Sequence, residues 1–124
     1  MTEKEFTINY LKEFKKDWWA FKISDMARTI KPFDFFWINK DWVIFCEVKV
    51  IDNDIFDIMQ LRNNQFTALE KITLLSEKYN LVNLIHPVVL IYSKKENKSK
   101  RIYFRTLLNN YNNGIFKTKI DFNK

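Results

Sequence analysis

Residues 32–49 read PFDFFWINKDWVIFCEVK and join two apolar runs through a short polar break. Their aromatic and β-branched content predicts a strand over 33–38, a turn at 39–41 and a second strand over 42–50. The second run is apolar at both parities until Glu47, which is typical of a central strand with both faces covered. The stretch therefore predicts a hairpin in the middle of a sheet.

Three charged residues, Asp34, Glu47 and Lys49, stand inside these apolar runs. Burying a charge without a partner is costly, so chains rarely place acids there without a use for them. Side chains two residues apart in a strand share a face, so Glu47 and Lys49 point the same way. If the hairpin pairs as predicted, Asp34 reaches that face as well. We therefore expect two carboxylates and one amine to meet at one site.

Two carboxylates and an amine suit metal-assisted hydrolysis of a phosphodiester bond. Carboxylate oxygens bind Mg²⁺, for which Mn²⁺ can substitute, and leave positions open for water and a phosphate. The metal activates a water, and a lysine orients that water or stabilises charge that develops on the phosphate. The alternative interpretation is an ion pair at a strand end with no catalytic role. The apolar surroundings favour the first interpretation.

The sequences PFD at 32–34 and EVK at 47–49 resemble the signature of the PD-(D/E)xK nuclease superfamily. The later sequence NNQFTALEKI at 63–72 resembles the glutamine-containing motif that follows the Glu-x-Lys strand in Holliday junction resolvases. This resemblance implies a restriction-endonuclease-like α/β fold, in which helices flank a mixed central sheet. It also implies a metal-dependent DNA endonuclease that acts on branched DNA as a homodimer.

The resemblance assigns a role to each matching residue. Asp34 and Glu47 would be catalytic ligands of Mg²⁺, Lys49 the catalytic lysine, and Gln65 a catalytic residue that positions a ligand or water. Two other functions stay open on the same fold: a restriction-type or repair nuclease, and a catalytically silent module that binds nucleic acid or a partner protein.

An acid on the first helix often completes the metal site in this superfamily. Glu3 is the better match, because its spacing to Phe6 and Tyr10 predicts that it lies on the buried face of that helix. Glu5 is the rival. An ordinary first-turn acid that interacts with the helix dipole is an equally good interpretation of either residue.

Apolar spacing predicts the rest of the fold. The remaining elements are a helix over 3–14, a strand over 18–23, a loop over 51–57, a helix over 57–79, a strand over 86–93, a charged turn over 94–101 and a last strand over 102–108 that runs into a short C-terminal element. The order α-β-β-β-α-β-β indicates a mixed α/β sheet with helices packed on it. We expect one domain over 1–124.

Composition narrows the class of protein. The formal charge of +6 and pI of about 9.4 favour an anionic partner such as DNA. A single glycine, Gly114, excludes glycine-rich phosphate loops. Cys46 and His86 are each the only residue of their type, which argues against zinc sites and histidine triads. The sequence has no apolar run long enough for a membrane span and no signal-peptide block, so we expect a soluble cytoplasmic protein.

Basic and aromatic residues supply candidate contacts to nucleic acid. The basic candidates are Lys22, Arg28, Lys31, Lys94, Lys95, Lys98, Lys100 and Arg101. They would bind phosphates, and the alternative is that they are ordinary solvated loop residues. The aromatic candidates are Trp18, Trp19, Trp37 and Trp42, which could stack on bases, although packing in the core is the stronger interpretation. The long helix region, with Met59, Leu61 and Phe66, is a candidate dimer face.

Overall fold

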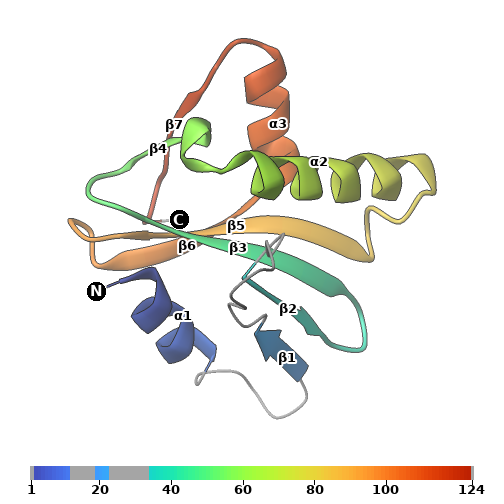
Figure 1. Cartoon of the computed structure of the whole chain (residues 1–124), viewed down its shortest axis with the longest axis horizontal. Coiled ribbons are helices and arrows are strands. Elements are labelled where there is room, and N and C mark those ends of the chain that lie inside the picture. The colour runs from blue at the N-terminus through green and yellow to red at the C-terminus, as the bar shows by residue number, and fades with distance from the viewer. Residues whose placement is uncertain (1, 12–18, 23–33, 124) are drawn as a thin grey trace.

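The computed structural model describes residues 2–11, 19–22 and 34–123 of the chain, with residues 11 and 19–22 described by their backbone alone. The elements in chain order are α1 (Glu3–Leu11), β1 (Trp19–Lys22), β2 (Phe35–Ile38), β3 (Val43–Ile51), β4 (Ile55–Asp57), the 3₁₀ turn η1 (Ile58–Gln60), α2 (Asn63–Lys78), β5 (Ile85–Ser93), β6 (Lys98–Tyr103), α3 (Phe104–Asn112) and β7 (Lys117–Lys119). Figure 1 shows their arrangement.

A mixed sheet forms the middle layer of the fold. Its strand order is β1-β2-β3-β5-β6, and β3 is central, as predicted. The pair β3–β5 is parallel, whereas the other neighbours are antiparallel. Helices α2 and α3 cover one face and α1 lies against the other (Figure 1). The predicted α/β class and the predicted order of the main elements are confirmed.

Strand β5 shows how the sheet divides the core in two. Val89 and Ile91 join the cluster under α2 and α3, while Val88 and Leu90 join the cluster under α1. All four side chains are at most 2% exposed. Because successive side chains in a strand point to opposite faces, a strand covered on both faces needs an unbroken apolar run. The sequence of β5 supplies that run.

The predicted hairpin turn is confirmed, and an asparagine organises it. Oδ1 of Asn39 accepts hydrogen bonds from the backbone N–H groups of Asp41 and Trp42, at 2.8 and 2.9 Å. The backbone N–H of Asn39 donates to the carbonyl of Trp42 at 3.1 Å. An Asn side chain can thus close a tight turn without a glycine. The register that follows pairs Ile38 with Val43.

The region between β3 and α2 differs from the prediction. The sequence pattern predicts a loop over 51–57 and a helix from 57, but α2 begins only at Asn63. Residues Ile55–Asp57 instead form β4, which pairs with β7 far along the chain. Oδ1 of Asp57 then caps η1 by accepting from the N–H of Met59 at 2.9 Å. The sequence pattern did not reveal that the helix begins later, because the apolar spacing continues through η1. The backbone at Leu61 is extended and separates η1 from α2.

The end of the chain also differs from the prediction. The charged turn predicted over 94–101 is shorter, because β6 begins at Lys98 and ends at Tyr103. The strand predicted to continue through 108 is instead helix α3, whose buried residues Phe104, Leu107 and Leu108 follow helical spacing. No helix among the described residues has the length and apolar character needed to cross a bilayer.

Candidate active site

The β2–β3 register brings Asp34 opposite Glu47. Phe35 pairs with Cys46, so the residue before Phe35 lies beside the residue after Cys46. Two backbone hydrogen bonds fix Asp34 there: its N–H donates to the carbonyl of Cys46 at 2.9 Å, and its Oδ2 accepts from the N–H of Val48 at 2.7 Å. The carboxylate is therefore held rigidly at the start of β2.

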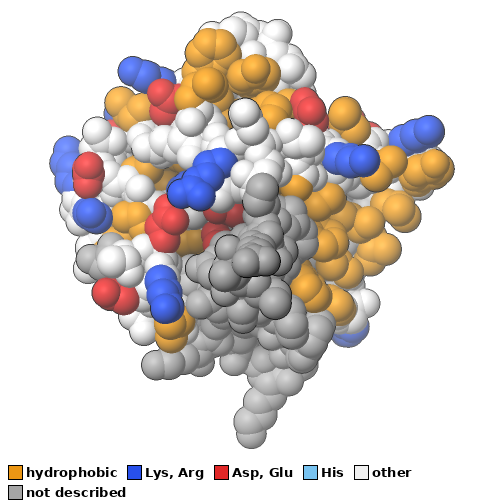
Figure 2. Space-filling model, viewed as in Figure 1, with side chains coloured by type: hydrophobic (Ala, Val, Ile, Leu, Met, Phe, Trp, Pro, Cys, Tyr) orange, Lys and Arg blue, Asp and Glu red, His pale blue; other side chains and the backbone are white. Residues whose placement is uncertain are grey.

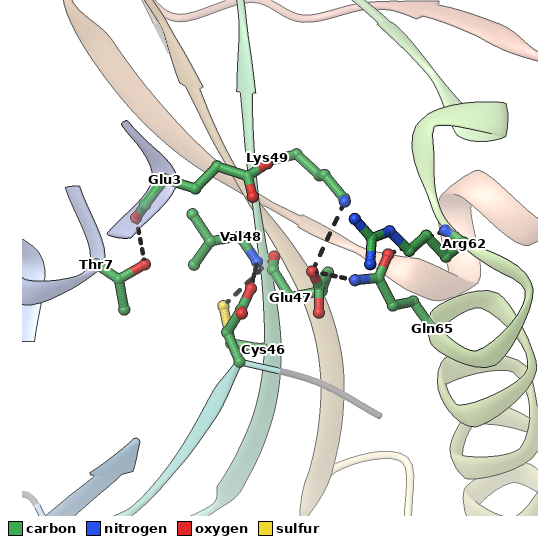
Figure 3. A network of polar contacts seen from close by, with 9 residues as sticks. Glu3, Thr7, Cys46, Glu47, Val48, Lys49, Arg62 and Gln65 are labelled. Atoms are coloured by element: carbon green, nitrogen blue, oxygen red, sulfur yellow. Dashed lines mark hydrogen bonds and ion pairs between the residues drawn. The ribbon is translucent and has the colours of Figure 1, made fainter. Parts of the chain in front are cut away.

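Glu47 is the centre of the site and is only 1% exposed. Its Oε1 accepts a hydrogen bond from Nε2 of Gln65 at 2.9 Å and lies 3.8 Å from Nζ of Lys49. Its Oε2 is buried, and no donor among the described residues reaches it. Figure 3 shows these side chains pointing toward one another from β3 and the start of α2, as strand geometry and the glutamine motif predict.

Gln65 also fixes the start of α2 against the sheet. Its Oε1 accepts from the backbone N–H of Arg62 at 2.9 Å, while its amide N–H reaches Glu47. One buried amide thus caps a helix and orients a carboxylate at the same time. The N-terminus of α2, with its partial positive charge, faces the site as a result.

Arg62 belongs to this site and was missed by the sequence analysis. Its side chain is exposed, and Figure 3 shows its guanidinium directed toward Lys49 and Gln65. The signal that could have found it is its position three residues before Gln65, at the residue that precedes α2. In the space-filling view, acidic and basic side chains gather between α1 and the start of α2, over the second half of β3 (Figure 2).

The surroundings of Glu47 raise its pKa from the ordinary 4.5 to about 9. Burial is the largest cause, followed by the charge of Asp34 and a hydrogen bond between the two carboxyl groups. Glu3 adds to the rise and Lys49 opposes it. At neutral pH the metal-free chain therefore keeps Glu47 neutral.

The donor set fits a hard divalent cation. The half-buried carboxylate of Asp34 lies beside the buried carboxyl group of Glu47, and one oxygen of Glu47 has no donor among the described residues. A divalent cation there would offset the clash of charges that raises the pKa of Glu47. The described residues hold no group of three or more acids, histidines or cysteines placed for a metal. Two protein ligands are nevertheless enough for Mg²⁺, which keeps several waters and takes substrate phosphates.

The expectation that Glu3 lies on the buried face of the first helix is wrong. Glu3 and Glu5 are both exposed, and the buried residues of α1 are Phe6 and Thr7. Glu3 is nevertheless near enough to Glu47 to raise its pKa, and its side chain extends from α1 toward β3 (Figure 3). Glu3 is therefore a better candidate than Glu5 for an additional metal ligand. It lies at the rim of the site and not in its interior.

The basic residues of 94–101 do not form one patch. Lys94 and Lys95 lie exposed in the β5–β6 turn, where Lys94 forms an ion pair with Asp52 at 3.7 Å. Nζ of Lys98 and Nζ of Lys100 each donate to the C-terminal segment at 2.9 Å. Arg101 points to the opposite face, because side chains alternate along β6. The sequence pattern predicts a turn over 94–101 and so does not predict that the side chains from Lys98 onward alternate between the two faces of the sheet.

Several of the predicted contacts to nucleic acid lie outside the residues that the structure describes. Arg28 and Lys31 lie outside the described residues, as does the side chain of Lys22. Trp18 and the side chain of Trp19 are also outside them.

The remaining tryptophans have different roles. Trp37 is fully buried in the core, as the stronger interpretation predicts, whereas Trp42 is half-buried at the edge of that cluster. Of the three residues named for the candidate dimer face, Leu61 is buried, Phe66 is partly buried against the core, and Met59 is 67% exposed.

Comparison with known proteins supports the fold. No family model and no curated protein matches the sequence. The 1.6 Å structure of Hjc, a Holliday junction resolvase from the archaeal hyperthermophile Archaeoglobus fulgidus, matches with a TM-score of 0.57. The chain shares the resolvase fold. The match covers 94% of this chain and 83% of Hjc at 14% identity, and it confirms the predicted restriction-endonuclease-like architecture.

Proposed function

We propose that the chain is a divalent-metal-dependent DNA endonuclease that acts on branched DNA. The observation that carries this proposal is the buried carboxyl of Glu47, which lies beside Asp34 and Lys49 and has one oxygen without a donor. A buried carboxyl group with an unsatisfied oxygen lowers stability, so proteins seldom keep one in the core without a functional reason. A group of this kind in a resolvase-like fold is best explained by a metal-dependent site.

Each residue has a distinct task in this mechanism. Asp34 and Glu47 would hold Mg²⁺ through carboxylate oxygens, and Glu47 would give up its proton on binding. An ion held there would supply charge stabilisation at the phosphate and a water of lowered pKa. Lys49, held 3.8 Å from Oε1 of Glu47, orients the attacking water. Gln65 keeps Glu47 in place and ties it to α2.

Branched DNA is the substrate that the comparison favours. Hjc is a Holliday junction resolvase, and this chain shares its fold over most of both lengths. The net charge of +6 suits a polyanionic substrate. A four-way junction presents symmetry-related strands, so we propose that two copies of the chain act together.

Arg62 is expected to bind a phosphate of the substrate beside the catalytic group. Its exposed guanidinium and the N-terminus of α2 lie on one side of the site, and both favour an anion. The substitution Arg62→Gln should weaken junction binding by roughly 10-fold and flatten its dependence on salt. Fluorescence anisotropy with a labelled junction over a series of salt concentrations measures both. Arg105→Gln, on α3, is the matched control, and equal losses for the two variants would argue against this role for Arg62.

A cleavage gel tests the proposed function. Wild-type protein with Mg²⁺ should cut a four-way junction faster than a flap or a linear duplex with the same arm sequences. Asp34→Asn keeps the size and the acceptor oxygen for Val48 but removes the charge, and it should lower the rate at least about 100-fold. Asp41→Asn, in the exposed hairpin turn, should cleave like wild type.

Three results would count against the proposal. The first is that wild-type protein cuts no form of DNA, and the second is that Asp34→Asn cuts as fast as wild type. Preferential cutting of linear duplex at one sequence would keep the nuclease but replace the branched substrate with a restriction-type one.

A further inference from the structure

A second cleft lies on the sheet face opposite the carboxylates. It has a volume of about 280 Å³, and the described residues that line it are Trp42, Ile44, His86, Val88, Arg101 and Tyr103. Ile44 and Val88 belong to the core cluster under α1, whereas Glu47 and Lys49 face Gln65 of α2. The cleft is therefore separate from the proposed catalytic site.

Flat rings form the walls of this cleft. The His86 ring stands edge-on to Trp42, with centroids 6.4 Å apart, and lies 5.5 Å from the ring of Tyr103. Tyr103 is 56% exposed, and Trp42 is half-buried. The exposed ring of Tyr103 offers a face on which another flat, conjugated group can stack.

The same cleft carries a positive charge. The Arg101 side chain is exposed, and its guanidinium lies 5.8 Å from the centroid of the buried Trp37 ring. In the part of the chain that the structure describes, no acidic side chain pairs with Arg101. Stacking on Trp37 holds the guanidinium plane while its outer N–H groups stay available to an anion.

His86 adds a polar edge without adding charge. Burial, and to a smaller extent the charge of Arg105, lower the pKa of His86, although a hydrogen bond with the backbone of Asn83 opposes the shift. The lowered pKa favours the neutral form of its imidazole. A neutral imidazole can accept or donate a hydrogen bond at the edge of a stacked ring.

We propose that this cleft binds one unpaired nucleotide of single-stranded nucleic acid, with its base stacked on Tyr103 and its phosphate on Arg101. The volume is at the lower end for ligand sites, so the cleft holds a single base and its sugar, not a duplex. The net charge of +6 favours the polyanion over an aromatic peptide. The proposal rests on the cleft alone and does not require the chain to be a nuclease.

Fluorescence anisotropy in EDTA tests the cleft without any cleavage. The two probes are a fluorescein-labelled oligothymidylate of about 12 nucleotides and an abasic strand of the same length and charge. Wild-type protein should bind the oligothymidylate at least about 5-fold more tightly than the abasic strand, because only bases can stack. Tyr103→Ala should reduce that ratio toward one.

Tyr79→Ala is the matched control, since Tyr79 is a comparably exposed tyrosine, at 61%, on the far end of α2. It should keep the wild-type ratio. Tyr103→Ala decides the test, because truncation of this exposed ring leaves the core intact. Equal binding of both strands by wild-type protein, or an unchanged ratio in Tyr103→Ala, would overturn the proposal. An aromatic peptide that competes while oligothymidylate does not would also overturn it.

Discussion

Glu47→Gln should make the metal-free chain more stable at pH 8, even though it removes the central residue of the proposed active site. The pKa of Glu47 is about 9 in the folded chain and near 4.5 when unfolded. Between these values the unfolded chain loses a proton that the folded chain keeps, so the free energy of unfolding falls as pH rises. Glutamine has the shape of the neutral acid and cannot ionise, so its variant escapes this loss.

The expected gain at pH 8 is of the order of a few kcal/mol, and it should vanish near pH 4.5, where the unfolded group also holds its proton. Urea unfolding in EDTA at a series of pH values measures it. Glu5→Gln, at an exposed position on α1, serves as the control and should follow the wild-type curve. Parallel curves for wild type and Glu47→Gln would show that Glu47 is ionised in the folded chain, which would contradict the site described above.

Lys49→Met should abolish cleavage while leaving the fold and DNA binding in place. The lysine is 9% exposed, and its ammonium lies 3.8 Å from Oε1 of Glu47. Methionine keeps much of the buried stem, so the loss reports on the charge rather than on packing. We expect the single-turnover rate on a four-way junction to fall by at least about 100-fold, as for loss of one electrostatic donor at a reacting phosphate.

Lys95→Met is the matched control, because Lys95 is exposed in the β5–β6 turn and should contribute only to binding. Junction affinity, measured by anisotropy in EDTA, should change less than about 3-fold for Lys49→Met. A variant that cleaves at the wild-type rate would leave Lys49 as a structural ion partner of Glu47. Loss of binding together with cleavage would assign Lys49 to substrate binding instead.

Local patterns were sufficient to predict the hairpin and the site it carries. Strand alternation places Glu47 and Lys49 on one face, and the turn at 39–41 fixes the register that brings Asp34 alongside. These relations depend only on residues close in sequence. The prediction that Gln65 acts at the same site as Glu47 rested instead on the resemblance to a known motif. The hydrogen bond between the two side chains agrees with that prediction.

Long-range pairing explains most of what was missed. β4 is a strand because β7, some sixty residues later, pairs with it, and no local pattern in Ile55–Asp57 signals this. The residues of α3 are apolar at spacings that suit either a strand or a helix, and packing against Phe66 decides for the helix. Glu3 was misplaced because α1 turns Phe6 and Thr7 toward the sheet.

Calorimetric titration with Mn²⁺ is the most direct test of the central claim that Asp34 and Glu47 together bind a divalent cation. Wild-type protein should give a saturable heat that depends on the buffer, because Glu47 releases a proton on binding. Asp34→Asn and Glu47→Gln should give only the heat of dilution. Identical titrations for wild type and Glu47→Gln would contradict the claim and favour a resolvase-like fold that binds nucleic acid without cutting it.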